Sequence, residues 1–333
     1  MKLPALLFSD PHFTSNPRDE YRWGLWKWIR EENRDGCFKT LVIAGDLTDA
    51  KDYHSSTLVN RLTNEIVQTS ALFEELIILR GNHDYLKDGH AFFSFLNLHH
   101  KIRFVTQPYE TSDAGPPTLF LPHVKNPAQA WAGMDFSHYD YLFLHQTVKG
   151  SKASNGQIMD GEELPKLSAM KVYSGDIHVP QIIGPVEYIG SPYPVHYGDK
   201  YRPRCIELDR NGKAHDLHYE TIARWSITVS SLSMLKRLAT EPGDQIKLKI
   251  KLAQAEKHEW SKLRREAAEW LKSQGVIVDG IELELERPRR RFSDATEASP
   301  ASQALRPEDA LLRFVQAEEL GADAYEVGME ILK

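Results

Sequence analysis

Short apolar runs alternate with longer amphipathic stretches over the first two hundred residues. The runs that fit buried strands are 5–8, 41–44, 76–79, 141–144, 172–173 and 186–189. Between them, the segments 21–30 and 58–67 carry apolar side chains at intervals of three to four residues, the period of an amphipathic helix. Strands that alternate with helices predict an α/β domain with a largely parallel sheet.

The pattern changes after residue 204, where apolar and polar residues begin to alternate one by one. The strand-like segments in this part are 225–229, 246–252, 276–278 and 281–285. A helix is predicted over residues 256–273, and Gly275 fits the position just beyond its last turn. These elements predict a second, smaller α+β domain over residues 206–286.

The last part of the chain has a different composition. Arginines gather at 287–291, and the Ser-, Ala- and Pro-rich stretch that follows is typical of a linker. Amphipathic helices are predicted again toward the C-terminus. The sequence therefore divides into a first domain at 1–205, the smaller domain, a basic segment and linker at 287–303, and a helical segment at 304–333.

Composition narrows the classes of protein that fit. Of 333 residues, 41% are hydrophobic and 26% charged, which is typical of a globular chain. The net charge is −6, so any binding to nucleic acid must come from local basic patches. Two cysteines exclude a disulfide framework and a four-thiolate zinc site. Because no apolar run approaches the ~20 residues of a membrane span and no signal peptide is evident, we expect a cytoplasmic protein, in a bacterium or in the host of a phage.

Polar residues follow five of the predicted strands. They are Asp10, His12, Asp46, Asn82, His83, Asp84, His145, Asp176 and His178. Ligands of open α/β sheets gather beyond the carboxyl ends of the strands, so these side chains are expected at one rim. Carboxylate, imidazole and amide groups together suit Mn²⁺, Fe²⁺ or Zn²⁺. The number of candidate ligands suits two ions that share a carboxylate, an arrangement that recurs in phosphoryl transfer.

The motifs themselves resemble a known family. They are Asp-Pro-His at 10–12, Gly-Asp-Leu-Thr-Asp at 45–49, Gly-Asn-His-Asp at 81–84, His145, and Gly-Asp-Ile-His at 175–178. This set resembles the calcineurin-like binuclear metallophosphoesterases. The Gly-Ser-Pro stretch at 190–192 is similar to that of SbcD-type nucleases, the DNA-cutting subunits of the bacterial SbcC–SbcD complexes. The motif match covers about residues 8–200, and the match beyond it is one of position only.

The resemblance implies a fold, an activity and partners. The fold is an α/β, four-layer metallophosphoesterase sandwich with a smaller α+β capping domain at 206–286 that binds DNA. The activity is that of a metal-dependent DNA phosphodiesterase, an exonuclease with some single-strand endonuclease activity. The C-terminal helices at 304–333 are expected to dock on an SbcC-like coiled-coil ATPase. A homodimer through helices of the catalytic domain is also implied.

The resemblance also implies a role for each site residue. One metal ion would be held by Asp10, His12 and His178. The other would be held by Asn82, His145 and Asp176, with Asp46 bridging the two ions. His83 would face the scissile phosphate as a general acid or charge stabiliser, oriented by Asp84. His123 and His138 belong to no recognisable set of ligands, and we expect them on surface loops.

Asp176 departs from the family pattern, which usually has histidine at this position. A third carboxylate lowers the residual positive charge of two divalent ions and replaces a nitrogen ligand with oxygen. We therefore expect a preference for Mn²⁺, with Mg²⁺ as the alternative, over softer ions.

Several residues are candidates for contact with DNA. Lys247, Lys249 and Lys251 alternate with apolar residues and so emerge on one face of a strand. The other candidates are Arg289, Arg290 and Tyr193, the last as a platform on which a base stacks. An ordinary solvated face remains an alternative for the lysines, because the neighbouring helix also carries several glutamates.

Two other functions stay open at this stage. One is a nucleotide or cyclic-nucleotide phosphodiesterase, or a phosphatase, on the same catalytic domain. Protein serine/threonine phosphatases differ from the chain, which has Thr48-Asp49-Ala50 after the second motif and Asp84 in the third. The other is a metal-stabilised scaffold that recruits an ATPase.

Overall fold

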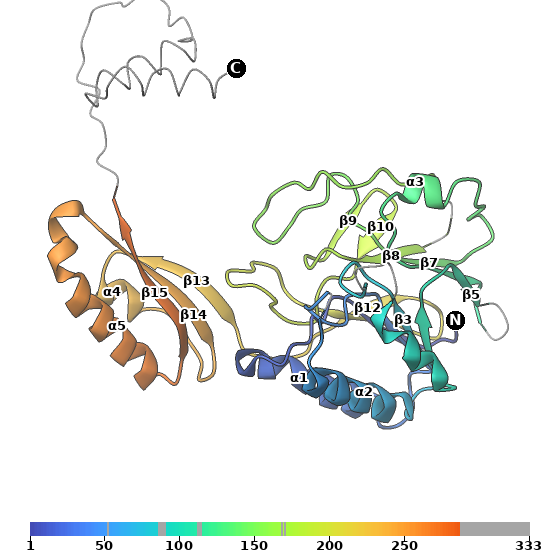
Figure 1. Ribbon diagram of the computed structural model, residues 1–333, viewed down its shortest axis with the longest axis horizontal. Coiled ribbons are helices and arrows are strands. Elements are labelled where there is room, and N and C mark those ends of the chain that lie inside the picture. Colours follow the sequence, from blue (N-terminus) through green and yellow to red (C-terminus); the bar gives the residue numbers. More distant parts are fainter. Residues whose placement is uncertain (52, 86–90, 112–114, 168, 170, 287–333) are drawn as a thin grey trace, which may run out of the picture. The chain divides into compact units, whose positions relative to one another are not determined.

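The computed structural model describes residues 1–286, except 52, 86–90, 112–114, 168 and 170 (Figure 1). Contacts within the backbone divide the chain into two units, Met1–Glu286 and Arg287–Lys333. The second unit falls outside the described residues. The basic segment, the linker and the C-terminal helices that we expect beyond residue 286 therefore remain predictions.

The first sheet has six strands and a parallel centre. Its order is β12 (Ala214–Leu217), β11 (Cys205–Leu208), β1 (Ala5–Phe8), β2 (Thr40–Ile43), β3 (Glu75–Leu79) and β4 (Ile102–Val105). Strands β1 to β4 are parallel, whereas β11 and β12 add to the edge in antiparallel fashion. The boundary that we placed at residue 205 therefore changes: the first domain keeps pairing its backbone as far as Leu217.

The second sheet is built in the same way from the middle of the chain. Its order is β5 (Tyr109–Thr111), β6 (Thr118–Leu121), β7 (Tyr141–His145), β8 (Lys171–Gly175), β10 (Val186–Tyr188) and β9 (Gln181–Ile183). Strands β6, β7, β8 and β10 are parallel, and both edge strands are antiparallel. The two sheets together form the predicted α/β sandwich.

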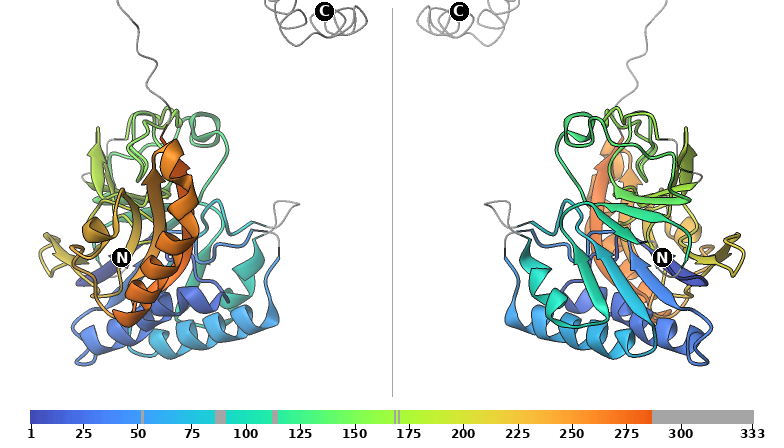
Figure 2. Two further views of the ribbon diagram at one scale, coloured as in Figure 1. Left: turned by 90° about the vertical axis from the view of Figure 1, so that its left-hand side faces the viewer. Right: turned by 90° about the vertical axis from the view of Figure 1, so that its right-hand side faces the viewer.

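Alternation along each strand decides which layer a side chain enters. In β1, Leu6 and Phe8 pack against the helices, whereas Leu7 packs between the two sheets. Helices α1 (Glu20–Glu32) and α2 (Ser56–Ser70) lie side by side along the outer face of the first sheet (Figure 2). In the described part of the chain, no helix is both long and apolar enough to cross a membrane.

The outer face of the second sheet is covered differently. Leu142 and Leu144 pack against Trp131, Phe136 and Tyr139, which come from loops around the four-residue helix α3 (Pro127–Ala130). The fourth layer of the predicted sandwich is therefore made mainly of loops. The connections from β7 to β8 and from β8 to β9 contain no helix in their described residues.

The third sheet belongs to the smaller α+β domain, which we call the cap (residues 224–286). Strands β13 (Arg224–Val229), β14 (Gln245–Leu252) and β15 (Ile277–Leu285) run parallel in that order. Its helices are α4 (Leu232–Leu235), the 3-10 helix η3 (Gln254–Glu259) and α5 (Trp260–Ser273). Alternate residues of β14 pack against Ala267 and Leu271 of α5. Gly275 has φ +72 and ends this helix as predicted.

Candidate metal centre

The carboxyl ends of five parallel strands deliver the candidate ligands to one place. Asp10 and His12 follow β1, Asp46 follows β2, and Asn82 and His83 follow β3. From the second sheet, His145 ends β7, and Asp176 and His178 follow β8. The facing ends of the two sheets thus form a single polar centre, as the order of motifs predicts.

Backbone strain is concentrated in these residues. Among the described residues other than glycine, four have a positive φ: Asp10, His12, Asp46 and Asp176. All four are predicted metal ligands. A left-handed conformation costs a residue with a side chain about 1–3 kcal/mol, and such strain persists where the surroundings enforce it, often at functional sites. The strain therefore marks the same residues as the motifs do.

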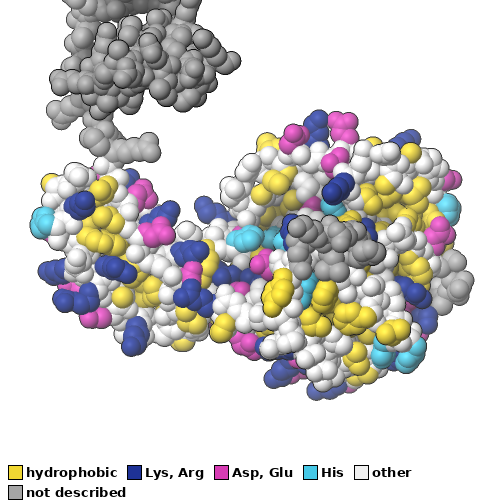
Figure 3. Space-filling model, viewed as in Figure 1, with side chains coloured by type: hydrophobic (Ala, Val, Ile, Leu, Met, Phe, Trp, Pro, Cys, Tyr) yellow, Lys and Arg dark blue, Asp and Glu magenta, His cyan; other side chains and the backbone are white. Residues whose placement is uncertain are grey.

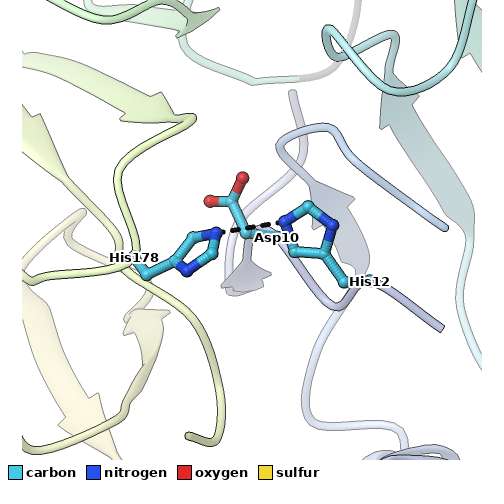
Figure 4. Close-up of side chains that lie close together, drawn as sticks. All are labelled: Asp10, His12 and His178. Carbon is cyan, nitrogen blue, oxygen red and sulfur yellow. Dashed lines mark hydrogen bonds between the residues drawn. The ribbon is translucent and has the colours of Figure 1, made fainter. Parts of the chain in front are cut away.

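Asp10, His12 and His178 form the first cluster (Figure 4). The Nε2 atoms of the two histidines are 3.0 Å apart. Two ligand atoms that bind one ion at about 2.1 Å and at a right angle are separated by about this distance. Burial lowers the pKa of His178 to about 4, and His196 adds to the effect. Burial also lowers the pKa of His12 well below its usual value, so both rings are neutral and able to bind a cation.

Asp46 lies at the centre of the cluster. Its carboxylate oxygens are 3.7 Å from His12 Nε2, 3.3 Å from His145 Nε2 and 4.0 Å from His83 Nε2. It belongs to two of the clusters that fit a metal ion, one with His12 and His83 and one with Asp10 and His145. This central position suits a carboxylate that bridges two ions.

Glycine makes the close approach to Asp46 possible. A Cβ atom on Gly81 would collide with the Asp46 carboxylate and backbone, and one on Gly45 would collide with the ring of His145. Gly45 also has φ +100, a conformation that residues with a side chain rarely adopt. The glycines of these two motifs therefore serve packing at the centre.

His145, Asn82 and Asp176 surround the other side of Asp46. His145 Nδ1 donates to the Ala44 carbonyl at 2.7 Å, which leaves Nε2 facing the carboxylates. Asn82 Nδ2 donates to Asp176 Oδ1 at 2.9 Å, and Thr147 Oγ1 donates to Asp176 Oδ2. The Asp176 backbone N–H in turn donates to Asp10. The structure thus brings all seven predicted ligands together.

The residues at this centre fit divalent cations. Among the seven predicted ligands, three buried atoms have no hydrogen-bond partner in the described part of the chain: His12 Nδ1, Asn82 Oδ1 and His145 Nε2. A buried polar atom without a partner is destabilising, so native structures usually satisfy it with protein, water or an ion. Two of the three, the Asn82 oxygen and His145 Nε2, are the atoms expected to bind the second ion.

The pKa shifts of the buried ionisable groups also fit a site for cations. Burial raises the pKa of Asp10 to about 7, and the charges of Asp46 and Asp176 act in the same direction. Burial also acts against ionisation of Asp46, but the charge of His145 outweighs it and holds the pKa of Asp46 below its usual range. Likewise, the charge of Asp46 overcomes burial and raises the pKa of His145 well above 6.5. Carboxylates so close together favour an added positive charge.

His83 reaches the same centre, but Asp84 does not orient it. The His83 ring is positioned by its Nδ1, which lies 2.8 Å from the Asp49 carbonyl oxygen. Asp84 is fully buried and accepts backbone N–H groups of Gly81, Asp46 and Leu47 at 2.7, 3.0 and 3.2 Å. The role that we predicted for Asp84 is therefore corrected: it joins the loops after β2 and β3.

The candidate DNA contacts have mixed outcomes. Lys247 and Lys249 are exposed on one face of β14, with Lys251 partly exposed beside them, and each lies within 4.0 Å of an acidic residue of the cap. On the face of the described unit that Figure 3 shows, basic and acidic side chains likewise lie beside one another. Tyr193 is fully buried and donates its hydroxyl to the Pro11 carbonyl, so it cannot stack on a base. Arg289 and Arg290 lie outside the described residues.

His123 is a residue that the sequence reasoning missed. It follows β6, the parallel neighbour of β7, and its ring centre is 6.2 Å from that of His145. Burial lowers the pKa of His123 to about 4, and the charge of His145 adds to this. The signal was a histidine beyond an apolar strand, the same pattern that located the predicted ligands. It was overlooked because Thr118–Leu121 is short and follows two prolines.

The family model for calcineurin-like phosphoesterases matches residues 3–180, more than half of the chain. A solved structure of a novel archaeal phosphodiesterase is 11% identical, with a TM-score of 0.35 over 65% of this chain and 99% of that one. A protein of unknown function from Aquifex aeolicus is 14% identical, with a TM-score of 0.27 over 56% and 89%. No curated protein matches the sequence.

Proposed function

The chain belongs to the calcineurin-like phosphoesterase family, and on this premise we propose that it is a metal-dependent nuclease that hydrolyses phosphodiester bonds in DNA. Phosphoester hydrolysis follows from the family. The narrower proposal is an SbcD-like exonuclease with some single-strand endonuclease activity, which acts in DNA end processing, recombination or replication. Mn²⁺ is the proposed metal, because it accepts both carboxylate oxygen and imidazole nitrogen.

The chemistry follows from the residues at the centre. When bound, two divalent ions hold the phosphate oxygens and lower the pKa of the attacking water. Asp10, His12 and His178 would hold one ion and Asn82, His145 and Asp176 the other, with Asp46 between them. His83 would donate a hydrogen bond or a proton at the phosphate, because its Nε2 faces the centre while Nδ1 is fixed by Asp49.

One observation carries the choice of a polymeric substrate. A cleft of about 680 Å³ lies between the cap and the first domain, and His196 on its wall stacks on His178 at 5.2 Å between ring centres. The basic residues that line it are Arg18, Arg22, Arg224, Lys247 and Lys249. Asp19, Asp279 and Glu282 also line the cleft, so its five basic residues exceed its acidic ones by two. A strand whose scissile phosphate lies at the metal centre would therefore have a channel of net positive charge for its next phosphates.

A second candidate is a nucleotide or cyclic-nucleotide phosphodiesterase. The acidic residues beside the cap lysines favour it, because they reduce the positive charge available to a long polyanion. A cleft of this volume also matches the size of a small-ligand site.

The test is to incubate the purified protein and Mn²⁺ with end-labelled single- and double-stranded DNA, beside bis-p-nitrophenyl phosphate. Asp46→Asn is the inactive control, since it removes the bridging charge. Cleavage of DNA by the wild type but not by the variant is the expected result. Hydrolysis of the small ester without cleavage of either DNA would favour the second candidate.

The proposal includes an SbcC-like coiled-coil ATPase as a partner. Its support is the position of residues 304–333, which matches that of the docking helices of SbcD-type nucleases, and these residues lie outside the described ones. Co-expression of the full chain with such an ATPase tests it: the two should elute as one complex, and elution of the nuclease alone would contradict the proposal. Size measurement of the purified chain tests the implied homodimer.

A further inference from the structure

We propose that His123 supplies an imidazole nitrogen to the second metal position, beside His145 and Asp176. The inference deepens the proposed function and rests on its two-metal centre. It assigns a ligand that none of the sequence motifs contains.

The fold brings His123 to the correct rim. Strand β6 pairs with β7 in parallel, with Leu121 beside Leu144. His123 comes two residues beyond the end of β6, as His145 comes at the end of β7. The two rings are 6.2 Å apart at their centres and nearly perpendicular, at 79°.

The backbone of His123 is fixed by the loop that carries Asn82. Its N–H donates to the Arg80 carbonyl at 2.9 Å. Its own carbonyl accepts from Arg80 Nη2 at 2.6 Å and from the Tyr85 hydroxyl at 2.8 Å. Three hydrogen bonds therefore hold the residue against Asn82's loop without using either ring nitrogen. A ligand that is positioned before the ion arrives loses little entropy on binding.

The ring itself has an unused buried nitrogen. His123 Nδ1 is shielded from solvent and has no hydrogen-bond partner within the described residues. Tyr85 packs edge-on against the ring, so an aromatic surface lies where a polar neighbour would be needed. The other atoms at the second position with the same property are Asn82 Oδ1 and His145 Nε2, the expected ligands.

The second metal position would have few free ligand atoms without His123. Both oxygens of Asp176 already accept hydrogen bonds, one from Asn82 and one from Thr147. His145 is then the one imidazole among the predicted ligands of this ion. With a metal–nitrogen distance of about 2.1 Å, two imidazoles on opposite sides of an ion have ring centres about 6.5 Å apart. The observed separation from His145 lies within that reach.

Metal binding to the intact protein tests the inference without any assay of activity. Calorimetry with Mn²⁺ should give two binding events for the wild type. His123→Ala should leave the affinity of the first site unchanged. It should weaken the affinity of the second site at least tenfold, because the second ion loses one ligand. Electron spin-echo spectra of the fully loaded protein should lose one set of nitrogen couplings. His138→Ala is the matched control, since His138 is an exposed histidine of the same connection between β6 and β7.

Each outcome is decisive. Two unchanged binding events and unchanged nitrogen couplings in His123→Ala would overturn the inference and leave the proposed function intact. A wild type that binds fewer than two ions would overturn both. If His123→Ala does not fold, His123→Phe replaces it, because it keeps an aromatic ring but has no nitrogen that could bind an ion. It should weaken the second event in the same way, and unchanged affinity for both ions would contradict the proposal.

Discussion

At the scale of single residues, the centre combines strain with missing hydrogen bonds. Asp10 and Asp46 adopt left-handed conformations with φ of 53 and 54, and His12 and His145 each leave one buried ring nitrogen without a partner among the described residues. Both features oppose folding of the metal-free chain. Divalent ions that bind only the folded state would offset them, which ties stability to metal binding.

The first prediction concerns Asp84. Asp84→Ala removes the acceptor of three buried backbone N–H groups, so the metal-free protein should lose about 3 kcal/mol of unfolding free energy. Asp84→Asn keeps one acceptor oxygen and should lose less. Urea unfolding in the presence of a chelator measures both, with the exposed Asp35→Ala as control. If Asp84→Ala lost turnover but kept its stability, Asp84 would instead act by orienting His83.

The second prediction concerns pH. Burial raises the pKa of Asp10 from 3.8 to about 7, so the metal-free folded protein keeps this carboxyl protonated below neutral pH. A cation must displace that proton, and Mn²⁺ affinity should therefore fall at least tenfold for each pH unit below 7, since His145 must lose a proton as well. The contribution of Asp10 should level off above pH 7. Calorimetry at about pH 6 and pH 8, in buffers of different ionisation enthalpy, also measures the released protons; equal affinities at the two values would contradict the prediction.

The sequence located the ligands but not the neighbours of every side chain. Strand ends in parallel order are enough to bring Asp10, Asp46 and His145 to one rim, because the carboxyl ends must meet. Tyr193 looked like a stacking platform, yet its hydroxyl partner is Pro11, 182 positions away in the chain. Asp84 likewise bonds to backbone some 37 positions away. Contacts of this kind depend on how the two sheets pack, which local patterns do not specify.

At the scale of elements, the sandwich strands with continuous apolar runs were predicted except β6, and the edge strands of the two sandwich sheets were not. Strand β12 lies at the edge of the first sheet and none of its side chains is fully buried, so no continuous apolar run marks it. Its neighbour β11 is mostly buried but is interrupted by Glu207. The segments predicted as two strands at 276–278 and 281–285 form the single strand β15. A shift of register sets Gly280 opposite Lys247, which makes Asp279 the extra residue of a bulge. The bulge places the Asp279 carboxylate 3.4 Å from Lys247.

The third prediction tests whether the exposed face of β14 binds DNA. Glu282 and Glu286 lie 4.0 Å from Lys249 and Lys251, and exposed pairs of this kind add little stability. Glu282→Gln/Glu286→Gln should therefore leave the unfolding free energy nearly unchanged but tighten DNA binding severalfold, with a steeper dependence on salt. Fluorescence anisotropy at several salt concentrations measures this. Glu269→Gln on α5 is the control. Equal DNA affinity in the wild type and the double variant would mean that DNA does not bind to this face of β14.

At the scale of the whole described unit, buried charges join the cap to the first domain. Arg224 opens β13 and donates to the Val195 carbonyl at 2.6 Å. It also lies 3.5 Å from Asp19, which pairs with Arg22 at 3.2 Å. Arg22 donates in turn to the carbonyl of His12, a predicted metal ligand. A continuous set of contacts thus runs from the first strand of the cap to the metal centre, although the cap has an apolar core of its own.

The last prediction follows from that arrangement. Arg224→Ala removes the shorter of two hydrogen bonds to the Val195 carbonyl, which keeps that of Arg22 Nη2 at 3.3 Å. It also removes one of two cations from buried Asp19, and breaking a buried pair typically costs about 3–5 kcal/mol. Because the cap retains its own core, the loss should fall on the junction, so calorimetric unfolding should change from one transition to two. Arg265→Ala, an exposed arginine on α5, should keep a single transition. Limited proteolysis should cut Arg224→Ala faster between Leu217 and Arg224. A single, unshifted transition in Arg224→Ala would mean that the cap and first domain are held together mainly by other contacts, such as that of Gln245 with Arg18.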